Sequence, residues 1–171
     1  MEKTTSENDA LREDLIAIFE EVKETVWKAE GRSRAGLMLG PQDIAETTGQ
    51  GFIGGYFPMG SNIIIINIAP IRRILQNDQR QLLRPYVFHV LLHEYIHACG
   101  FCEENIVRQK TYEISKQQFG EDHLITQLST NIQKFLPQLL SPTQAWACPD
   151  GMHAIEIVPG FDSGNISPYI S

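Results

Sequence analysis

The feature that most constrains the fold is a predicted helix that carries two histidines four positions apart. Pro85 suits the first turn of a helix and Gly100 suits its end, so we predict a helix over residues 85–99. This segment contains the stretch His93-Glu94-Tyr95-Ile96-His97. Because residues four apart share one face of a helix, both imidazoles are expected to point the same way, with the Glu94 carboxylate beside them.

Two imidazoles on one helix face are a typical pair of metal ligands. Imidazole nitrogen suits zinc, so His93 and His97 are predicted to bind one zinc ion. Glu94 could then reach a water held by that ion and act as a general base. The alternative is a helix whose two polar histidines lie on its solvent-exposed side. The strands predicted before this helix and the glycine after it favour the metal site.

The segments before this helix predict one long helix and three strands. Apolar residues from Asn8 to about Glu30 recur at helical spacing. The strands are short, flanked by glycine and rich in branched or aromatic residues, and they are predicted over 35–40, 51–57 and 61–68. A short helix is predicted over 71–75. This part of the chain therefore supplies a sheet that leads into the histidine-bearing helix.

The segments after this helix predict two more helices, over 103–119 and 121–135, with Gly120 between them. The order of helix, strands and helices indicates the α+β class. A chain of 171 residues has room for one domain, which we expect to span 1–171. Its two ends, 1–7 and 159–171, are expected to be loose.

The charge of the chain limits its partners. Lys and Arg number 14 against 21 Asp and Glu, which gives a formal net charge of −7. Nucleic acids and anionic membranes attract Lys and Arg, so neither is an expected partner, and acidic substrates are mildly disfavoured. The polar N-terminus and the short apolar stretches favour a cytoplasmic location, and three cysteines fit a reducing compartment.

The histidine motif and its flanks, about residues 61–119, resemble the zincin metallopeptidases. The resemblance implies a zincin-like fold, in which a small mixed sheet packs on the active-site helix and further helices follow. It also implies zinc-dependent hydrolysis of a peptide or protein substrate, with one catalytic zinc ion and Glu94 as the catalytic residue. In that family an edge strand holds the substrate in extended form, and 61–68 is its obvious counterpart here. The apolar run in that strand is equally consistent with a central core strand.

The third zinc ligand has several candidates. From His93 to Glu103 the sequence follows HExxHxxGxxE, which is similar to the metzincin pattern, although metzincins carry His or Asp at the last position. Gly100 matches their turn glycine, so the resemblance implies Glu103 as the third ligand. The gluzincins instead use a Glu from the next helix. The other candidates, in the order that helix rise and turn length favour them, are Glu104, Glu113 and His123.

Two further groups near the C-terminus have weaker interpretations. Met152 lies in turn-forming sequence and resembles the methionine turn of metzincins, although a loop methionine without a role is the simpler interpretation. A second zinc site is conceivable if Cys99 and Cys102 meet Cys148 and His153. The alternative for these cysteines is that they are free thiols, buried or half-buried.

Several residues could assist the predicted zinc site. His89 lies one turn before His93 and could support it as a hydrogen-bonding partner, or it could simply be packed. Donors for an oxyanion could be Tyr112, His153 or Tyr169. The alternative function is a zinc-binding regulatory or binding protein with a zincin-like fold and little proteolysis. A helical scaffold without a metal is a third possibility, and the sequence does not indicate an oligomeric state.

Overall fold

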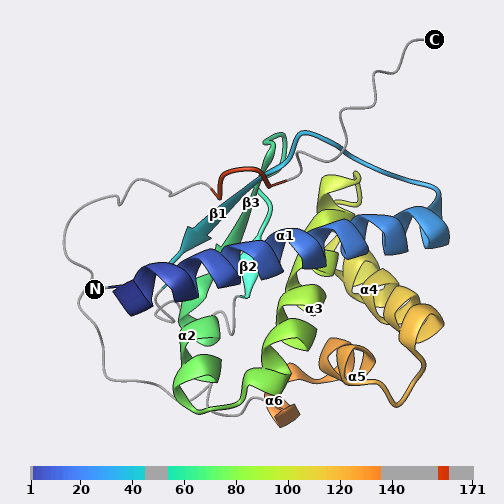
Figure 1. The fold of residues 1–171 in the computed structure, drawn as a ribbon. Helices are drawn as coiled ribbons and strands as arrows, with labels where there is room; N and C mark the ends of the chain where they lie inside the picture. Colours follow the sequence, from blue (N-terminus) through green and yellow to red (C-terminus); the bar gives the residue numbers. More distant parts are fainter. Residues whose placement is uncertain (1, 45–53, 136–157, 162–171) are drawn as a thin grey trace.

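The computed structural model describes residues 2–44, 54–135 and 158–161, which form a small sheet surrounded by helices (Figure 1). The elements in chain order are α1 (Glu2–Glu30), β1 (Met38–Gln42), β2 (Gly55–Tyr56), β3 (Ile63–Asn67), α2 (Ile68–Gln76), α3 (Arg80–Ala98), α4 (Glu104–Phe119), α5 (Leu124–Thr130) and α6 (Ile132–Phe135). The predicted α+β class is confirmed. None of the described helices combines the length and apolarity of a bilayer span.

The three described strands form a mixed sheet in the order β1-β3-β2. β3 pairs in parallel with β1, where Met38 lies opposite Ile63, and antiparallel with β2, where Tyr56 lies opposite Ile65. β3 is therefore the central strand, and its buried isoleucines explain the apolar run in the sequence. Of the two interpretations of 61–68, the edge strand was wrong and the central core strand is confirmed. β2 takes the edge position on the side of α3.

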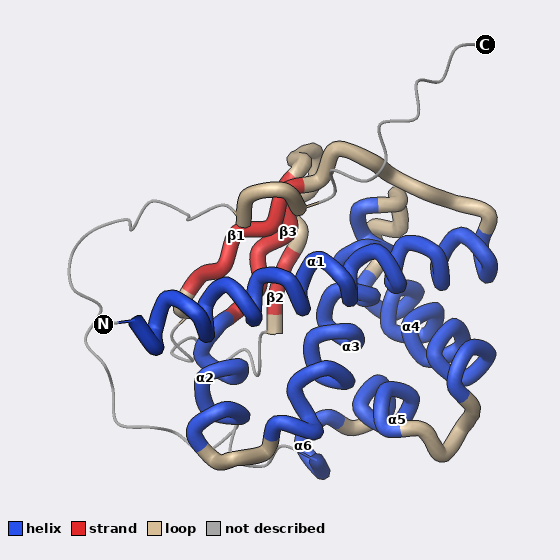
Figure 2. The backbone as a smooth tube through the Cα atoms, viewed as in Figure 1, coloured by secondary structure: helices blue, strands red, loops and turns tan. Residues whose placement is uncertain are grey.

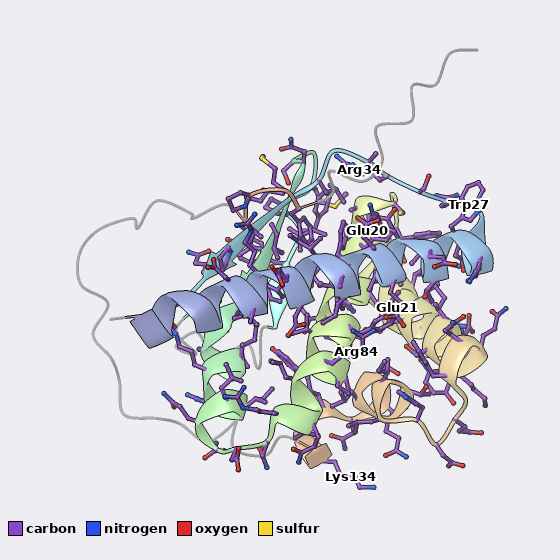
Figure 3. All side chains as sticks on the ribbon, in the orientation of Figure 1. Glu20, Glu21, Trp27, Arg34, Arg84 and Lys134 are labelled. Atoms are coloured by element: carbon purple, nitrogen blue, oxygen red, sulfur yellow. The ribbon has the colours of Figure 1, made fainter. Side chains whose placement is uncertain are left out.

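Helix α3, which carries the histidine motif, lies between the sheet and the α4–α5 pair (Figure 2). The long helix α1 packs across it with an apolar stripe that is almost fully buried. Phe19 of α1 meets Tyr95 of α3 edge to face, with ring centroids 5.4 Å apart. At the surface, Arg84 of α3 pairs with Glu21 of α1 (Figure 3). Burial on several sides fixes the direction in which α3 presents its polar residues.

The C-terminal end of α3 is also tied to the segment that follows α1. The Tyr95 hydroxyl accepts the backbone N–H of Arg34 at 2.8 Å and donates to the carbonyl of the same residue at 3.2 Å. The Arg34 guanidinium donates to the carbonyls of Ala98, at 3.0 Å, and Ser61, at 2.6 Å. These bonds hold the last turn of α3 against the start of β3. They also satisfy the hydrogen-bonding groups of the buried Tyr95 hydroxyl, whose burial without partners would cost free energy.

Helix α3 begins at Arg80, five residues earlier than predicted, so Pro85 lies inside it. Proline lacks the N–H of an interior helix position and usually ends or kinks a helix. Here Leu82 and Leu83, upstream of the proline, pack against the hydrophobic core. This tertiary packing explains why the helix extends to the N-terminal side of Pro85.

The predicted loose ends are partly ordered. Helix α1 begins at Glu2 instead of Asn8, because adding a turn to a packed helix costs less than starting a new one. Near the other end, the Val158 N–H donates to the Leu39 carbonyl at 2.8 Å, and Phe161 stacks on Phe19 with centroids 4.2 Å apart. Residues 159–161 are therefore not loose as expected, and 162–171 lie outside the described residues.

Candidate metal centre

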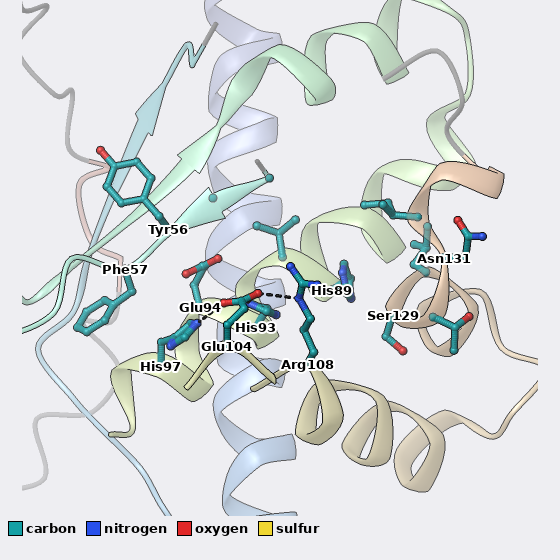
Figure 4. Close-up of a pocket in the computed structure, with 16 residues that line it drawn as sticks. Tyr56, Phe57, His89, His93, Glu94, His97, Glu104, Arg108, Ser129 and Asn131 are labelled. Carbon is teal, nitrogen blue, oxygen red and sulfur yellow. Dashed lines mark hydrogen bonds and ion pairs between the residues drawn. The ribbon is translucent and has the colours of Figure 1, made fainter. Parts of the chain in front are cut away.

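The two histidines of the motif project from the same side of α3, as their spacing predicts (Figure 4). Their ring centroids lie 5.2 Å apart. Both side chains are largely shielded from solvent, with 17% of His93 and 13% of His97 exposed. Burial, partly offset by the Glu104 charge, lowers the pKa of His93. A neutral imidazole is the form that binds a metal.

Glu104, in the first turn of α4, completes a group of three possible ligands. One carboxylate oxygen lies 3.3 Å from His93 Nε2 and the other 3.2 Å from His97 Nε2. The ligand atoms of the three residues all lie within 4.8 Å of one another. Among the described residues, this is the group of His, Cys, Asp and Glu side chains that could hold a metal ion. Glu104 was the second-ranked candidate from the sequence.

Glu103, the first-ranked candidate, is not part of this group. It is the exposed N-cap residue of α4, with extended backbone at φ −83° and ψ 121°. The chain enters the helix at the next residue, so it is Glu104 that lies on the helix face turned to the histidines. Gly100, with φ +103°, provides the turn between α3 and this segment, as its position in the motif predicts.

The remaining candidates for a third ligand or a second site lie elsewhere in the described structure or outside it. Glu113 accepts a hydrogen bond from the Gln109 amide at 2.8 Å on the exposed side of α4. His123 caps α5, where its Nδ1 accepts the Ile125 N–H at 3.2 Å. Cys99 and Cys102 are free thiols. Four further residues named from the sequence for a second site or for support of the metal lie outside the described residues: Cys148, Met152, His153 and Tyr169.

The hydrogen bonds of His97 indicate that a proton or a metal ion lies between its ring and Glu104. Its Nδ1 lies 2.8 Å from the Phe101 carbonyl oxygen, which can only accept, so Nδ1 carries a proton. In the neutral ring, Nε2 then presents a lone pair to the Glu104 carboxylate. Two acceptors this close repel each other unless a proton or a metal ion lies between them. A carbonyl on the far nitrogen is also the usual way in which a protein orients a metal-binding histidine.

The distances within the cluster fit a zinc ion. Ligands about 2.0–2.1 Å from a tetrahedral zinc lie about 3.3 Å from one another. One Glu104 oxygen lies 3.3 Å from His93 Nε2 and the other lies 3.2 Å from His97 Nε2, so each contact is close to this edge length. Two imidazoles and one carboxylate are also a known donor set for catalytic zinc. The residues present therefore fit the metal that the sequence predicts.

Glu94 lies beside the cluster in a protected position. Only 6% of the residue is exposed. Burial, reinforced by the Glu104 charge and opposed by a backbone hydrogen bond from Phe57, raises its pKa to about 8. Gly55 lets β2 approach closely, because a Cβ at this position would lie 2.6 Å from the Ile65 carbonyl oxygen and 3.5 Å from Glu94 Cγ. The strand thus covers one side of the carboxyl group.

The raised pKa of Glu94 predicts an unusual pH dependence in the metal-free protein. Between its ordinary pKa of 4.5 and about 8, the folded protein holds a proton that the unfolded chain releases. The free energy of unfolding therefore falls as pH rises through this window, by up to ~1.4 kcal/mol per pH unit. Glu94→Gln removes this contribution, so the wild type should lose more stability than the variant between pH 5 and 8.

Urea unfolding in the presence of a chelator at pH 5, 6, 7 and 8 measures this difference. His93 and Glu104 also titrate, but they are present in both proteins, so the comparison isolates Glu94. Glu113→Gln, which removes an exposed carboxylate from α4, serves as the control and should follow the wild type. Parallel pH profiles for wild type and Glu94→Gln would show that Glu94 is not held in its protonated form.

The cluster opens on a cavity of about 800 Å³. Strand β2 and the α5–α6 region lie on opposite sides of the histidines (Figure 4). The prediction of a single helix over 121–135 was wrong. The chain forms two helices there, α5 and α6, because the backbone at Asn131, with φ −156°, interrupts the helical conformation. The polar residues at this interruption, 129–131, line the cavity. The cavity thus has a strand edge on one side and a polar helix junction on the other.

Arg108 is a residue of the cavity that the sequence interpretation missed. Its Nε donates to Glu104 Oε1 at 2.8 Å, so it both lines the cavity and contacts the candidate ligand. The spacing of four residues between Glu104 and Arg108 was the signal that could have found it.

His89 also lines the cavity, and its buried Nδ1 has no hydrogen-bond partner among the described residues. Tyr112, proposed as an oxyanion donor, instead directs its hydroxyl to Glu121.

Comparison of this chain with protein-family models, with curated proteins and with solved structures gives no match. The resemblance to zincins therefore depends on the residues of the motif and on the geometry around them.

Proposed function

We propose that this protein is a zinc-dependent peptidase. One observation carries the proposal: His93, His97 and Glu104 converge in the wall of a cavity, and the buried carboxyl group of Glu94 lies next to them. A structural zinc site is closed by four protein ligands, whereas a catalytic one has three and keeps a position for water or substrate. The described residues supply three ligands, which favours catalysis.

The three ligands would hold the zinc ion and fix its charge. The two neutral imidazoles and the single carboxylate of Glu104 leave a bound zinc ion with a net positive charge. When bound there, the ion would supply Lewis acidity toward water and toward a substrate carbonyl. The Phe101 carbonyl would hold the His97 ring in the orientation that presents Nε2.

Glu94 would move the proton. Hydrolysis of an amide requires a base that takes a proton from the attacking water and an acid that gives one to the departing amine. In the metal-free protein burial raises the pKa of Glu94 to about 8, so this carboxyl group can hold and release a proton close to physiological pH. The Phe57 backbone and the close approach of β2 at Gly55 would keep its side chain in place.

Strand β2 would hold an extended substrate. It is an edge strand that pairs with β3 on one side, and residues 54–57 line the cavity. An exposed strand edge can bind a peptide through main-chain hydrogen bonds, whatever the side chains of the peptide. The same arrangement would align the scissile bond with the metal cluster. The geometry thus favours peptides over other amides as the substrate class.

Metal content and cleavage test the proposal together. Elemental analysis of protein purified without chelator or added metal should give one zinc per chain. The zinc-loaded protein should cleave members of a diverse synthetic peptide library, lose this activity with a chelator and regain it with added zinc. Stoichiometric zinc without cleavage would support a zinc-binding regulatory protein instead. Absence of zinc, even after addition of zinc salts, would support a helical scaffold without a metal.

A further inference from the structure

We infer that Arg108 makes the cavity selective for substrates that carry a carboxylate side chain close to the scissile bond. The inference rests on the proposed peptidase function and adds a substrate class to it. It depends on three features: the position of the Arg108 guanidinium, the hydrogen-bond donors of the cavity wall, and the charge that this wall would have with zinc bound.

The guanidinium of Arg108 lies beside the metal cluster. The residue follows Glu104 by one turn of α4, and its Nε donates to that carboxylate at 2.8 Å (Figure 4). This bond uses one of five N–H donors. No hydrogen bond from its two terminal nitrogens is seen among the described residues, and 70% of the side chain is exposed. A guanidinium anchored through Nε presents a planar pair of donors that matches a carboxylate.

The charge of the cavity wall differs from that of the whole chain. Among the described lining residues, Arg108 is the one lysine or arginine, and Glu94 and Glu104 are the acids. With a zinc ion in place, the two acids are outweighed by the metal and Arg108 together. With zinc bound, the cavity would therefore be locally positive, although the chain carries a formal net charge of −7. Local charge at a cleft decides which ligands concentrate there.

The rest of the polar wall offers few competing donors. The Ser129 hydroxyl donates to the Thr126 carbonyl at 2.6 Å, and the Thr130 hydroxyl donates to the Gln127 carbonyl at 2.8 Å. The Asn131 side-chain oxygen accepts the Lys134 N–H at 3.1 Å, which leaves its amide N–H groups to donate. Arg108 and Asn131 thus provide donors for an anionic group in the cavity. A neutral group would leave the terminal nitrogens of Arg108 without an anionic partner.

A substrate preference measured within each variant tests this inference. The zinc-loaded full-length protein is incubated with a synthetic peptide library, and the cleavage sites are identified by mass spectrometry. We expect Asp and Glu to be enriched at one position within two residues of the scissile bond. Two peptides that differ only by Glu or Gln at that position should then differ in kcat/KM by about tenfold, the effect of one charge-assisted interaction.

The variants compared are Arg108→Gln and, as a matched control, Lys116→Gln. Lys116 is an exposed cation of the same helix, outside the cavity, so its removal changes the total charge equally. The preference for Glu over Gln should fall to near unity in Arg108→Gln and persist in Lys116→Gln. Because the preference is a ratio within one protein, a change in zinc occupancy caused by loss of the Glu104 contact cancels.

A second arm separates this inference from the proposed function. Zinc-loaded Glu94→Gln is incubated with the same library, and the bound peptides are recovered and sequenced. Cleavage without an acidic preference, or with a preference that survives Arg108→Gln, overturns the inference and leaves the peptidase proposal intact. Binding of acidic peptides that depends on Arg108, without cleavage by the wild type, supports the recognition and refutes the hydrolysis. If the wild type cleaves no peptide and Glu94→Gln enriches none, both the peptidase proposal and the inference about Arg108 are refuted.

Discussion

Replacing Glu94 by glutamine should reduce peptide cleavage by about 10²–10⁴-fold, the usual contribution of a general acid–base residue. Glutamine has nearly the same shape and can still accept the Phe57 backbone hydrogen bond, so the local structure should persist. Since Glu94 does not belong to the ligand cluster, zinc affinity should stay within about twofold of the wild type. Zinc titration and kcat/KM on one cleaved peptide measure the two effects separately.

The control for this substitution is Glu113→Gln, which removes a carboxylate from the exposed side of α4. It should leave both zinc affinity and cleavage unchanged. Undiminished cleavage by Glu94→Gln would mean that another group transfers the proton. A parallel loss of zinc and cleavage would mean that Glu94 holds the metal.

The second large effect is a loss of zinc affinity, which should follow substitution of Glu104 but not of its neighbour Glu103. Loss of a residue that merely supports a metal ligand costs about 10–100-fold in affinity, so loss of a ligand should cost at least ~100-fold. Glu104→Gln should therefore weaken zinc binding by at least this factor, because its carboxylate lies against both imidazoles. Glu103→Gln should change the affinity by less than about twofold, because that side chain is exposed at the start of α4.

Competition with a chromophoric zinc chelator measures both affinities under identical conditions. The two variants differ from the wild type by the same chemical change at adjacent positions, so each is the control for the other. A larger loss in Glu103→Gln than in Glu104→Gln would restore the metzincin-like ligand set that the sequence pattern implies. Equal small losses would mean that neither carboxylate binds the metal.

The relation between these glutamates shows how far the sequence predicts the site. The approach of His93 and His97 follows from helix periodicity alone, so their spacing was enough to predict it. The third ligand lies across a turn, where the backbone conformation of a single residue decides which side chain faces the histidines. Glu103 is extended and Glu104 is helical, whereas the motif in the sequence ranked Glu103 first and Glu104 second.

In the fold, too, features set by local sequence were predicted and features set by tertiary contacts were not. Short strands and amphipathic helices were predicted from local patterns, and the α+β class followed from their order. The order of strands within the sheet depends on long-range pairing, so the sequence left an edge position and a central position equally open for β3, which is central. The start of α3 upstream of Pro85 depends on the packing of Leu82 and Leu83. Such features follow from tertiary contacts that no local pattern contains.

The most direct measurement is a crystal structure of the zinc-loaded protein, with anomalous data at the zinc edge. We expect one strong peak, with His93 Nε2, His97 Nε2 and a Glu104 oxygen about 2.0–2.2 Å away. A fourth position occupied by water should face Glu94 and the cavity. A zinc ion held by cysteines elsewhere, or one between these histidines that is closed by a fourth protein ligand, would contradict a catalytic metal at this site.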